Sequence, residues 1–173
     1  NITLPCGTGC VTINAKVPHI KQTNSYVITN PAYVPFAYTT TSGNIPTEIY
    51  IDDRWSNAIN PGFSFCYYGN NFSSLIMGSN SALSFDMSRA NTGSGYSISS
   101  TTGAIPNTAY APNMIFGPYH DINPNLSSPN KKIEWRVEGT APNRRFIASY
   151  NDIPYFGSSC TTPRATHQMV LYE

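Results

Sequence analysis

The 173-residue chain is poor in charged side chains. Lys, Arg, Asp and Glu make up 11% of it and the formal net charge is +1, whereas about 25% charged residues is typical of soluble proteins. It has no long basic run to neutralise phosphates, which argues against nucleic acid as a partner. No apolar run approaches the ~18 residues of a transmembrane helix, so we expect no membrane span.

Helical periodicity and nucleophile motifs are also lacking. No segment repeats its apolar residues at helical spacing, and no G-x-S-x-G elbow is present. The chain has three histidines. His120 and Asp121 cannot form a dyad on a strand, because adjacent residues point to opposite faces. We therefore expect no catalytic residues.

What the chain has in abundance is aromatic and small polar side chains. Aromatic residues reach 13%, with 12 tyrosines, and clusters of Asn, Ser, Thr, Gly and Pro separate short apolar segments about every ten residues. This pattern is typical of secreted β proteins. Strands are predicted within 10–17, 24–29, 47–51, 62–69, 73–87 (two around a turn at 78–81) and 113–122.

The segment from Lys131 to Phe156 is the best strand signal in the sequence. Apolar Ile133, Trp135 and Val137 alternate with charged side chains at 132, 134, 136 and 138, which predicts a hairpin strand with one core face and one solvent face. Residues 139–143 form the predicted turn. For Arg144 and Arg145 we expect weak surface bridges to glutamates, with ligand binding as the alternative.

These signals together predict an all-β fold, an antiparallel β-sandwich of jelly-roll type. We place an N-terminal disulfide loop and the first strands in 1–30 and the sandwich in 31–173. The apolar, strand-like segment 166–173 ends the given sequence. We expect from it that the sandwich is incomplete here and belongs to a longer protein.

Four cysteines predict two disulfides in an oxidising compartment. Cys6 and Cys10 enclose a short glycine-containing loop, which leaves Cys66 with Cys160. A zinc site is the alternative, but no second cysteine pair or nearby histidine completes one.

Metal binding and hydrolysis each have candidate residues. Asp121, Asn123 and Asn125 offer oxygen ligands at alternate positions, as calcium requires, although the same residues are ordinary in turns. A glycosidase needs only two carboxylates about 5–9 Å apart. The candidates for such a pair are Asp52, Asp53, Asp121, Glu134 and Asp152. Loop tyrosines at 96, 110, 119 and 155 can stack on sugars or cover the core, and the long loop at 88–112 is either functional or a surface excursion.

Several segments resemble the N-terminal region of the large cell-surface adhesins of gliding Bacteroidetes, which are substrates of the type IX secretion system. The matching segments, in order along nearly the whole chain, are LPCGTGCVTINAKV, YIDDRWSNAI, FSFCYYGNNFSSLIMGSNSALSFD, IFGPYHDINP, KKIEWRVEGTAPNRRFIASYNDIPYF and THQMVLYE. The resemblance is weakest at 88–112.

This resemblance implies a secreted, outer-membrane-associated protein displayed at the cell surface. It implies a role in gliding motility or attachment, with the type IX translocon as the partner that carries it as cargo and an extracellular surface or polysaccharide as its target. It also implies that further strands with cysteine follow, so Cys66 or Cys160 could pair outside this chain. The alternative is a carbohydrate-binding module or a fragment of a secreted glycoside hydrolase.

Overall fold

The computed structural model describes residues 30–96, 105, 107–157 and 162–173. The chain divides into two compact units, Asn1–Tyr33 and Val34–Glu173, where we expected a boundary at 30/31. Most of the first unit lies outside the described residues, and with it the predicted strands at 10–17 and 24–29 and the predicted Cys6–Cys10 disulfide. Everything below concerns the second unit.

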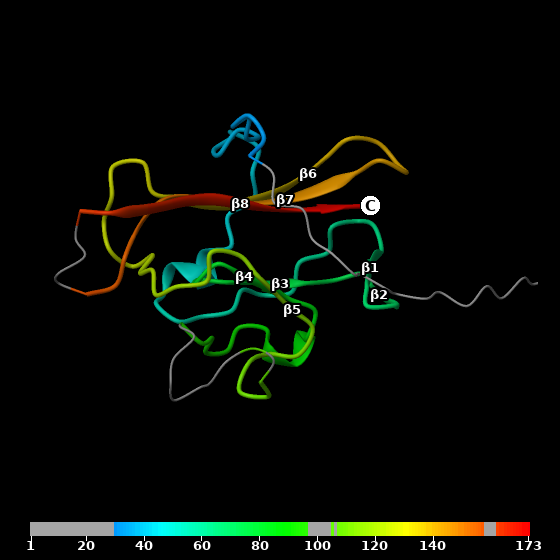
Figure 1. Cartoon of the computed structure of the whole chain (residues 1–173), viewed down its shortest axis with the longest axis horizontal. Coiled ribbons are helices and arrows are strands. Elements are labelled where there is room, and N and C mark those ends of the chain that lie inside the picture. Colours follow the sequence, from blue (N-terminus) through cyan, green and yellow to red (C-terminus); the bar gives the residue numbers. More distant parts are fainter. Residues whose placement is uncertain (1–29, 97–104, 106, 158–161) are drawn as a thin grey trace, which may run out of the picture. The chain divides into compact units, whose positions relative to one another are not determined.

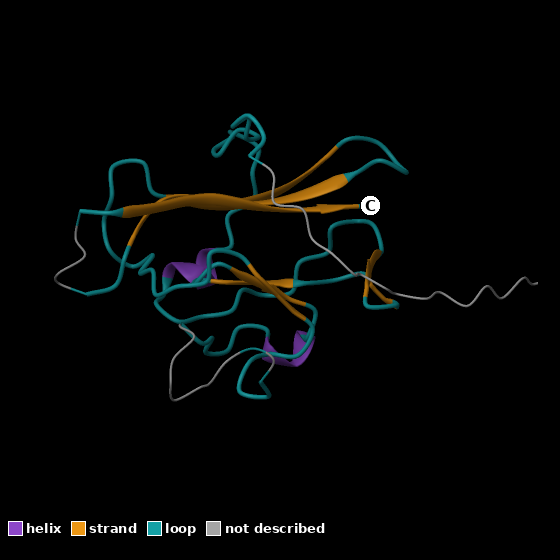
Figure 2. Cartoon of the chain, viewed as in Figure 1, coloured by secondary structure: helices purple, strands orange, loops and turns teal. Residues whose placement is uncertain are grey.

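The second unit is an all-β, antiparallel structure, as predicted (Figure 2). Its strands form three sheets, in the orders β1-β2, β3-β4-β5 and β6-β7-β8. The described part of the chain contains no helix long and apolar enough to cross a membrane. The elements are β1 Phe65–Tyr67, β2 Asn70–Phe72, β3 Ile76–Gly78, β4 Ala82–Ser84, β5 Met114–Phe116, β6 Lys132–Glu138, β7 Arg145–Pro154, β8 Arg164–Tyr172, and the 3-10 turns η1 Thr47–Tyr50 and η2 Met87–Arg89.

The β6-β7-β8 sheet contains the predicted hairpin. Its register pairs Ile133 with Tyr150 and Glu138 with Arg145, and the apolar face of β6 packs on the core as expected from its alternation. Strand β8 adds antiparallel to β7, with one irregularity between Tyr150 and Ile153. The predicted hairpin, its turn and its core face are confirmed, whereas the predicted solvent face of β6 is wrong at Glu134 and Arg136, which are buried.

The β3-β4-β5 sheet lies below it and is built from short strands (Figure 1). Its β3–β4 hairpin confirms the turn predicted at 78–81. Every residue of β3 and β4 is buried, because alternate side chains enter two different clusters. Met77 and Leu83 face the main core, whereas Ile76 and Ala82 face a second cluster around Trp55. The sequence of a strand that is covered on both faces is typically a continuous run of apolar residues.

The main core fills the space between the two sheets. Leu83 from β4 meets Phe146 and Tyr150 from β7 in one cluster, and all three are fully buried. The Tyr150 hydroxyl donates a 2.7 Å hydrogen bond to the Gly78 carbonyl and so joins the layers directly. These contacts make the two sheets the layers of a β-sandwich.

One predicted strand is wrong. The segment 47–51 forms the 3-10 turn η1 at Thr47–Tyr50 rather than a strand. Pro46 precedes it, and Ile49 alone among its residues is buried. A single buried anchor fits one helical turn, whereas a half-buried strand needs alternation over at least four residues.

Candidate functional site

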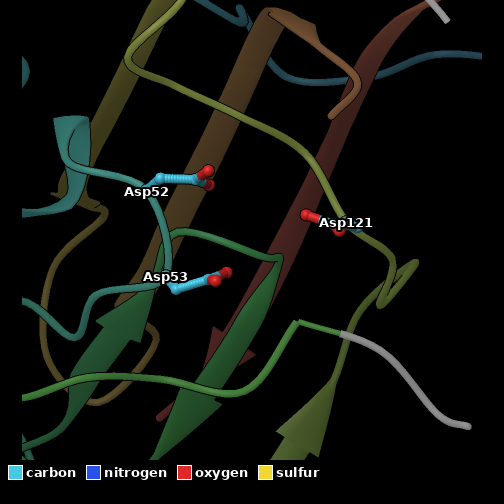
Figure 3. A group of neighbouring side chains, drawn as sticks. All are labelled: Asp52, Asp53 and Asp121. Atoms are coloured by element: carbon cyan, nitrogen blue, oxygen red, sulfur yellow. The ribbon is translucent and has the colours of Figure 1, made fainter. Parts of the chain in front are cut away.

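Three carboxylates from two distant segments meet at one place in the sandwich. Asp52 and Asp53 follow η1, and Asp121 lies in the segment after β5. Figure 3 shows the two side chains of the first pair pointing toward Asp121. One oxygen of each lies within 4.8 Å of the others. We call Asp52, Asp53 and Asp121 the acidic cluster.

Buried asparagines hold the acidic cluster in place. Asn80, in the β3–β4 turn, donates to Asp53 at 2.7 Å and accepts from the Ile122 backbone N–H at 2.9 Å. Asn123 donates to Asp52 at 2.7 Å. One amide side chain thus ties Asp53 to the backbone beside Asp121, and the carboxylates are fixed by the fold.

This arrangement makes the carboxyl groups hard to ionise together. Burial, then the neighbouring charges of Asp53 and Asp52, raise the pKa of Asp121 to about 6. Burial, then the charge of Asp53, raises the pKa of Asp52, whose Oδ1 is shielded and has no hydrogen-bond partner among the described residues. Three such carboxylates either share protons or attract a hard divalent cation, for which carboxylate oxygens are the usual ligands.

Of the three residues predicted for calcium, the structure places only Asp121 in the acidic cluster. Asn123 uses its oxygen to accept the Asn125 backbone N–H at 2.9 Å, and Asn125 is exposed. This Asn123–Asn125 hydrogen bond is typical of a turn, and calcium binding by these three residues stays a prediction. The sequence signal for the other two members is the adjacent pair Asp52-Asp53, which local spacing cannot connect to Asp121.

The sequence predicts Glu134, another carboxylate candidate, on a solvent face, but the structure does not place it there. It is fully buried, because the segment 36–44 crosses the outer face of the β6-β7-β8 sheet. Thr40 donates to the carboxylate from its backbone N–H at 3.0 Å and from its hydroxyl at 2.9 Å. Lys132 and Arg136 form ion pairs with it at 2.6 and 3.1 Å.

The charge of Glu134 is therefore fully used inside the protein. Burial opposes its ionisation, but hydrogen bonds from Lys132 and Thr40 outweigh burial and hold the pKa below its ordinary value. An added Cβ at Gly43 would collide with the Glu134 carboxylate, so the 36–44 segment packs directly against it. Glu134 is not placed to act on a sugar.

The two adjacent arginines form the surface bridges that we expected. Arg145 pairs with Glu138 directly across the hairpin at 2.8 Å. Arg144 pairs with Glu173 at 2.5 Å and also donates to the Gly62 carbonyl at 2.7 Å. Both guanidinium groups therefore serve the fold.

Comparison with known proteins adds one finding to this geometry. Residues 25–173 match the family model described as NIDO related. The chain belongs to the NIDO-related family. No curated protein and no solved structure matches it. The family match says nothing of gliding adhesins, Bacteroidetes or type IX secretion.

Two grooves of this NIDO-related chain lie apart from the acidic cluster. An open polar groove of about 850 Å³ is lined by Thr39, Thr40, Thr41, Pro129, Asn130, Lys131, Lys132, Asn151, Asp152 and Thr166. A smaller one of about 240 Å³ has aromatic walls from Tyr67, Tyr68, Tyr110 and Phe116. In the polar groove, the Asp152 carboxylate accepts hydrogen bonds from the Ser128 hydroxyl at 2.5 Å and from the Asn130 N–H at 2.8 Å.

The described histidines of the NIDO-related domain stack on tyrosines rather than joining a carboxylate. His120 stacks on Tyr155 and His167 on Tyr150, with ring centroids 4.7 and 4.8 Å apart. Burial, then the charge of His120, lowers the pKa of His167 to about 4. Tyr155, one of the predicted sugar-stacking aromatics, therefore already stacks on a side chain of the protein itself, His120.

Cys66 lies on β1 and is exposed, and no disulfide joins it to another described residue. Its predicted partner Cys160 lies outside the described residues, as do residues 97–104 and 106 of the loop at 88–112. The pairing of Cys66 with Cys160 stays a prediction.

Proposed function

We propose that this NIDO-related chain is a non-catalytic domain of a secreted cell-surface adhesin that is exported by the type IX secretion system and takes part in attachment and gliding motility. The sequence resemblance supplies the biological setting. The observation that supports a non-catalytic role is the use of the charged side chains. Glu134, Arg144 and Arg145, the most suggestive of them, are paired within the fold.

Display at a cell surface suits this construction. A sandwich with fully buried side chains from both layers holds its loops at fixed positions, and rigid scaffolds commonly carry binding loops. The polar groove beside Thr40 and Asn151 and the loops around it are the surfaces that we assign to contact with an extracellular surface or polysaccharide. The type IX translocon is the partner during export, with this domain as cargo.

A domain deletion tests the proposal. In a gliding bacterium that makes the parent protein, removal of residues 34–173 is expected to leave secretion intact and to reduce attachment and gliding. A matched strain with Arg145→Lys, which keeps the charge that faces Glu138, is expected to behave like the parent. Unchanged attachment in the deletion strain would overturn the proposal.

Sugar recognition is the second candidate, and the aromatic groove favours it. Tyr68 is 76% exposed and lines that groove with Tyr110, and exposed aromatic rings present apolar faces for stacking. A glycan array with the purified chain and with Tyr68→Ala separates a sugar reader from a simple scaffold. Binding that Tyr68→Ala abolishes supports the sugar reader.

Hydrolysis is tested in the same preparation. We expect no glycoside turnover, because Glu134 is fully buried and its charge is paired with Lys132 and Arg136. Turnover that Asp121→Asn abolishes would contradict the non-catalytic assignment.

A further inference from the structure

The two edges of the β6-β7-β8 sheet are treated differently by the rest of the chain. At the β6 edge, Asn44 exchanges two backbone hydrogen bonds with Trp135, at 2.8 and 2.9 Å. The Tyr50 hydroxyl accepts from the Ile133 N–H at 2.8 Å. The outward backbone N–H groups of Ile133 and Trp135 in β6 are therefore bonded within the chain.

The phase of hydrogen bonding shows which groups point outward at β8. The Glu173 N–H donates to the Arg144 carbonyl at 2.9 Å, so every second residue back from 173 directs its backbone toward β7. The residues between them, Gln168, Val170 and Tyr172, direct their N–H and C=O groups away from β7. The alternation at β6 agrees with this assignment. Ile133 and Trp135, whose backbone groups point away from β7, lie opposite Tyr150 and Ala148, which direct their own backbone groups toward β8.

The β8 edge is open among the described residues. No backbone hydrogen bond between described residues reaches the outward groups of Gln168, Val170 or Tyr172. Natural edge strands are usually protected by lysine, proline, a bulge or a short length. Strand β8 has nine residues and contains neither lysine nor proline.

The strand that would fill this edge must itself alternate. Toward the core β8 presents Ala165, Met169 and Leu171, all less than 10% exposed, and an added strand has to continue that apolar row on the same side. On the other side it has to offer polar or small side chains beside Gln168 and Val170. Strand β8 has this pattern itself and is therefore complementary to its own copy.

We propose that β8 pairs antiparallel with β8 of a second copy of this chain, which joins two three-stranded sheets into one continuous sheet. With the two-fold axis at Gln168, Val170 lies opposite Thr166 and Met169 opposite His167. Each residue then meets one from the same face, as an isologous interface requires. Only backbone bonds and one row of side chains form, so a dissociation constant on the order of tens of micromolar is expected.

Sedimentation equilibrium of the whole chain, over concentrations that bracket this constant, tests the dimer. Val170→Pro removes one outward N–H and leaves the donors to β7 in place. Tyr172→Lys puts a charge at the edge on a side chain that is 62% exposed. Both variants are expected to be monomers, whereas Ile51→Lys, the same charge change at a residue 54% exposed outside the sheet, is expected to keep the dimer.

Amide hydrogen exchange locates the contact. The N–H groups of Gln168, Val170 and Tyr172 are expected to slow at high concentration in the native chain and in Ile51→Lys alone. If Val170→Pro does not fold, Tyr172→Lys decides, since it changes only an exposed side chain. A monomer at every concentration, or a dimer that survives Tyr172→Lys without slowed exchange at β8, overturns the proposal. Neither result bears on the adhesin proposal, which does not depend on a dimer.

Discussion

Strands β6, β7 and β8 have seven, ten and nine residues, whereas β3, β4 and β5 have three each. The long-strand sheet is held mainly by its continuous backbone ladder. The short-strand sheet depends on side chains that reach backbone groups. For example, the Ser56 hydroxyl accepts the Met77 N–H at 2.9 Å, and Asn80 bonds to the Ile122 backbone.

The difference indicates where single substitutions should matter most. In the long-strand sheet, we expect the largest loss of stability on removal of a buried charged side chain, because the backbone ladder cannot neutralise the partner charges that remain. In the short-strand sheet, it is the polar side chain that substitutes for the missing ladder. A buried polar group without its partner costs more than the bond itself contributes.

Glu134→Ala is expected to have the largest effect. Removing this carboxylate breaks the ion pairs with Lys132 and the buried Arg136 and leaves Arg136 with Glu138 alone, and breaking a buried ion pair costs about 3–5 kcal/mol. Urea unfolding at pH 7 measures the loss. Glu138→Ala is the control: this half-exposed carboxylate also pairs with Arg136 and Arg145. Because Glu134 still faces Arg136 in this variant, the loss should be only about 1 kcal/mol. Equal losses for the two variants would contradict the buried role of Glu134.

Asn80→Ala tests the short-strand sheet. Asn80 is 1% exposed, and its loss leaves the Ile122 N–H and Asp53 without their partner. The expected destabilisation is about 2–3 kcal/mol, measured by the same unfolding experiment. Asn71→Ala, at an exposed asparagine of β2, should change little. A small effect of Asn80→Ala would show that the short strands do not need this side chain.

Two groups should also respond to pH in opposite directions, His167 in the long-strand sheet and Asp121 in the segment between β5 and β6. His167 on β8 has a pKa lowered to about 4, below the ordinary value near 6.5. The unfolded chain therefore binds this proton first, and stability is lost as the pH falls from about 6.5 through 4. Because His167 is only partly shielded from solvent, we expect the free energy of unfolding to fall by about 2 kcal/mol over this pH range. His167→Phe, which keeps the ring stack on Tyr150, should flatten the acid side of a plot of melting temperature against pH.

Asp121→Asn gives the smallest change, and it is a gain. The pKa of Asp121 is raised to about 6, so its contribution to stability is present below pH 4 and is lost as the pH rises through 6. Removing the charge should stabilise the protein at pH 7 by about 1 kcal/mol after solvent screening. Thermal melts with calcium and with chelator complete the test. A variant less stable than the native chain in calcium would mean that the acidic cluster holds a cation.

The local part of this fold could be predicted from sequence. The alternation of Ile133, Trp135 and Val137 predicts strand β6 and its core face, and the turn at 78–81 predicts the β3–β4 hairpin. Both signals arise between neighbours in the chain. The same reasoning predicts the bridge of Arg145 to Glu138, since hairpin register follows from the turn. The partner of Arg144 is Glu173, which follows β8 and lies outside this hairpin.

The non-local part could not be predicted. The spacing of Glu134 indicates an exposed residue, and it is buried only because the distant segment 36–44 crosses that face of the sheet. Likewise, Asp121 meets Asp52 and Asp53 through the β3–β4 turn, which lies between them in the sequence. Side-chain period within one strand carries no information about which remote segment covers it.

The close approach of Gly43 to the Glu134 carboxylate has an evolutionary consequence. A side chain at position 43 and a carboxylate at 134 compete for one volume, so the two positions are not independent. Among NIDO-related sequences, a larger residue at 43 should appear together with a shorter or uncharged residue at 134. Such paired change would report on a contact between parts of the chain that lie 91 positions apart in the sequence.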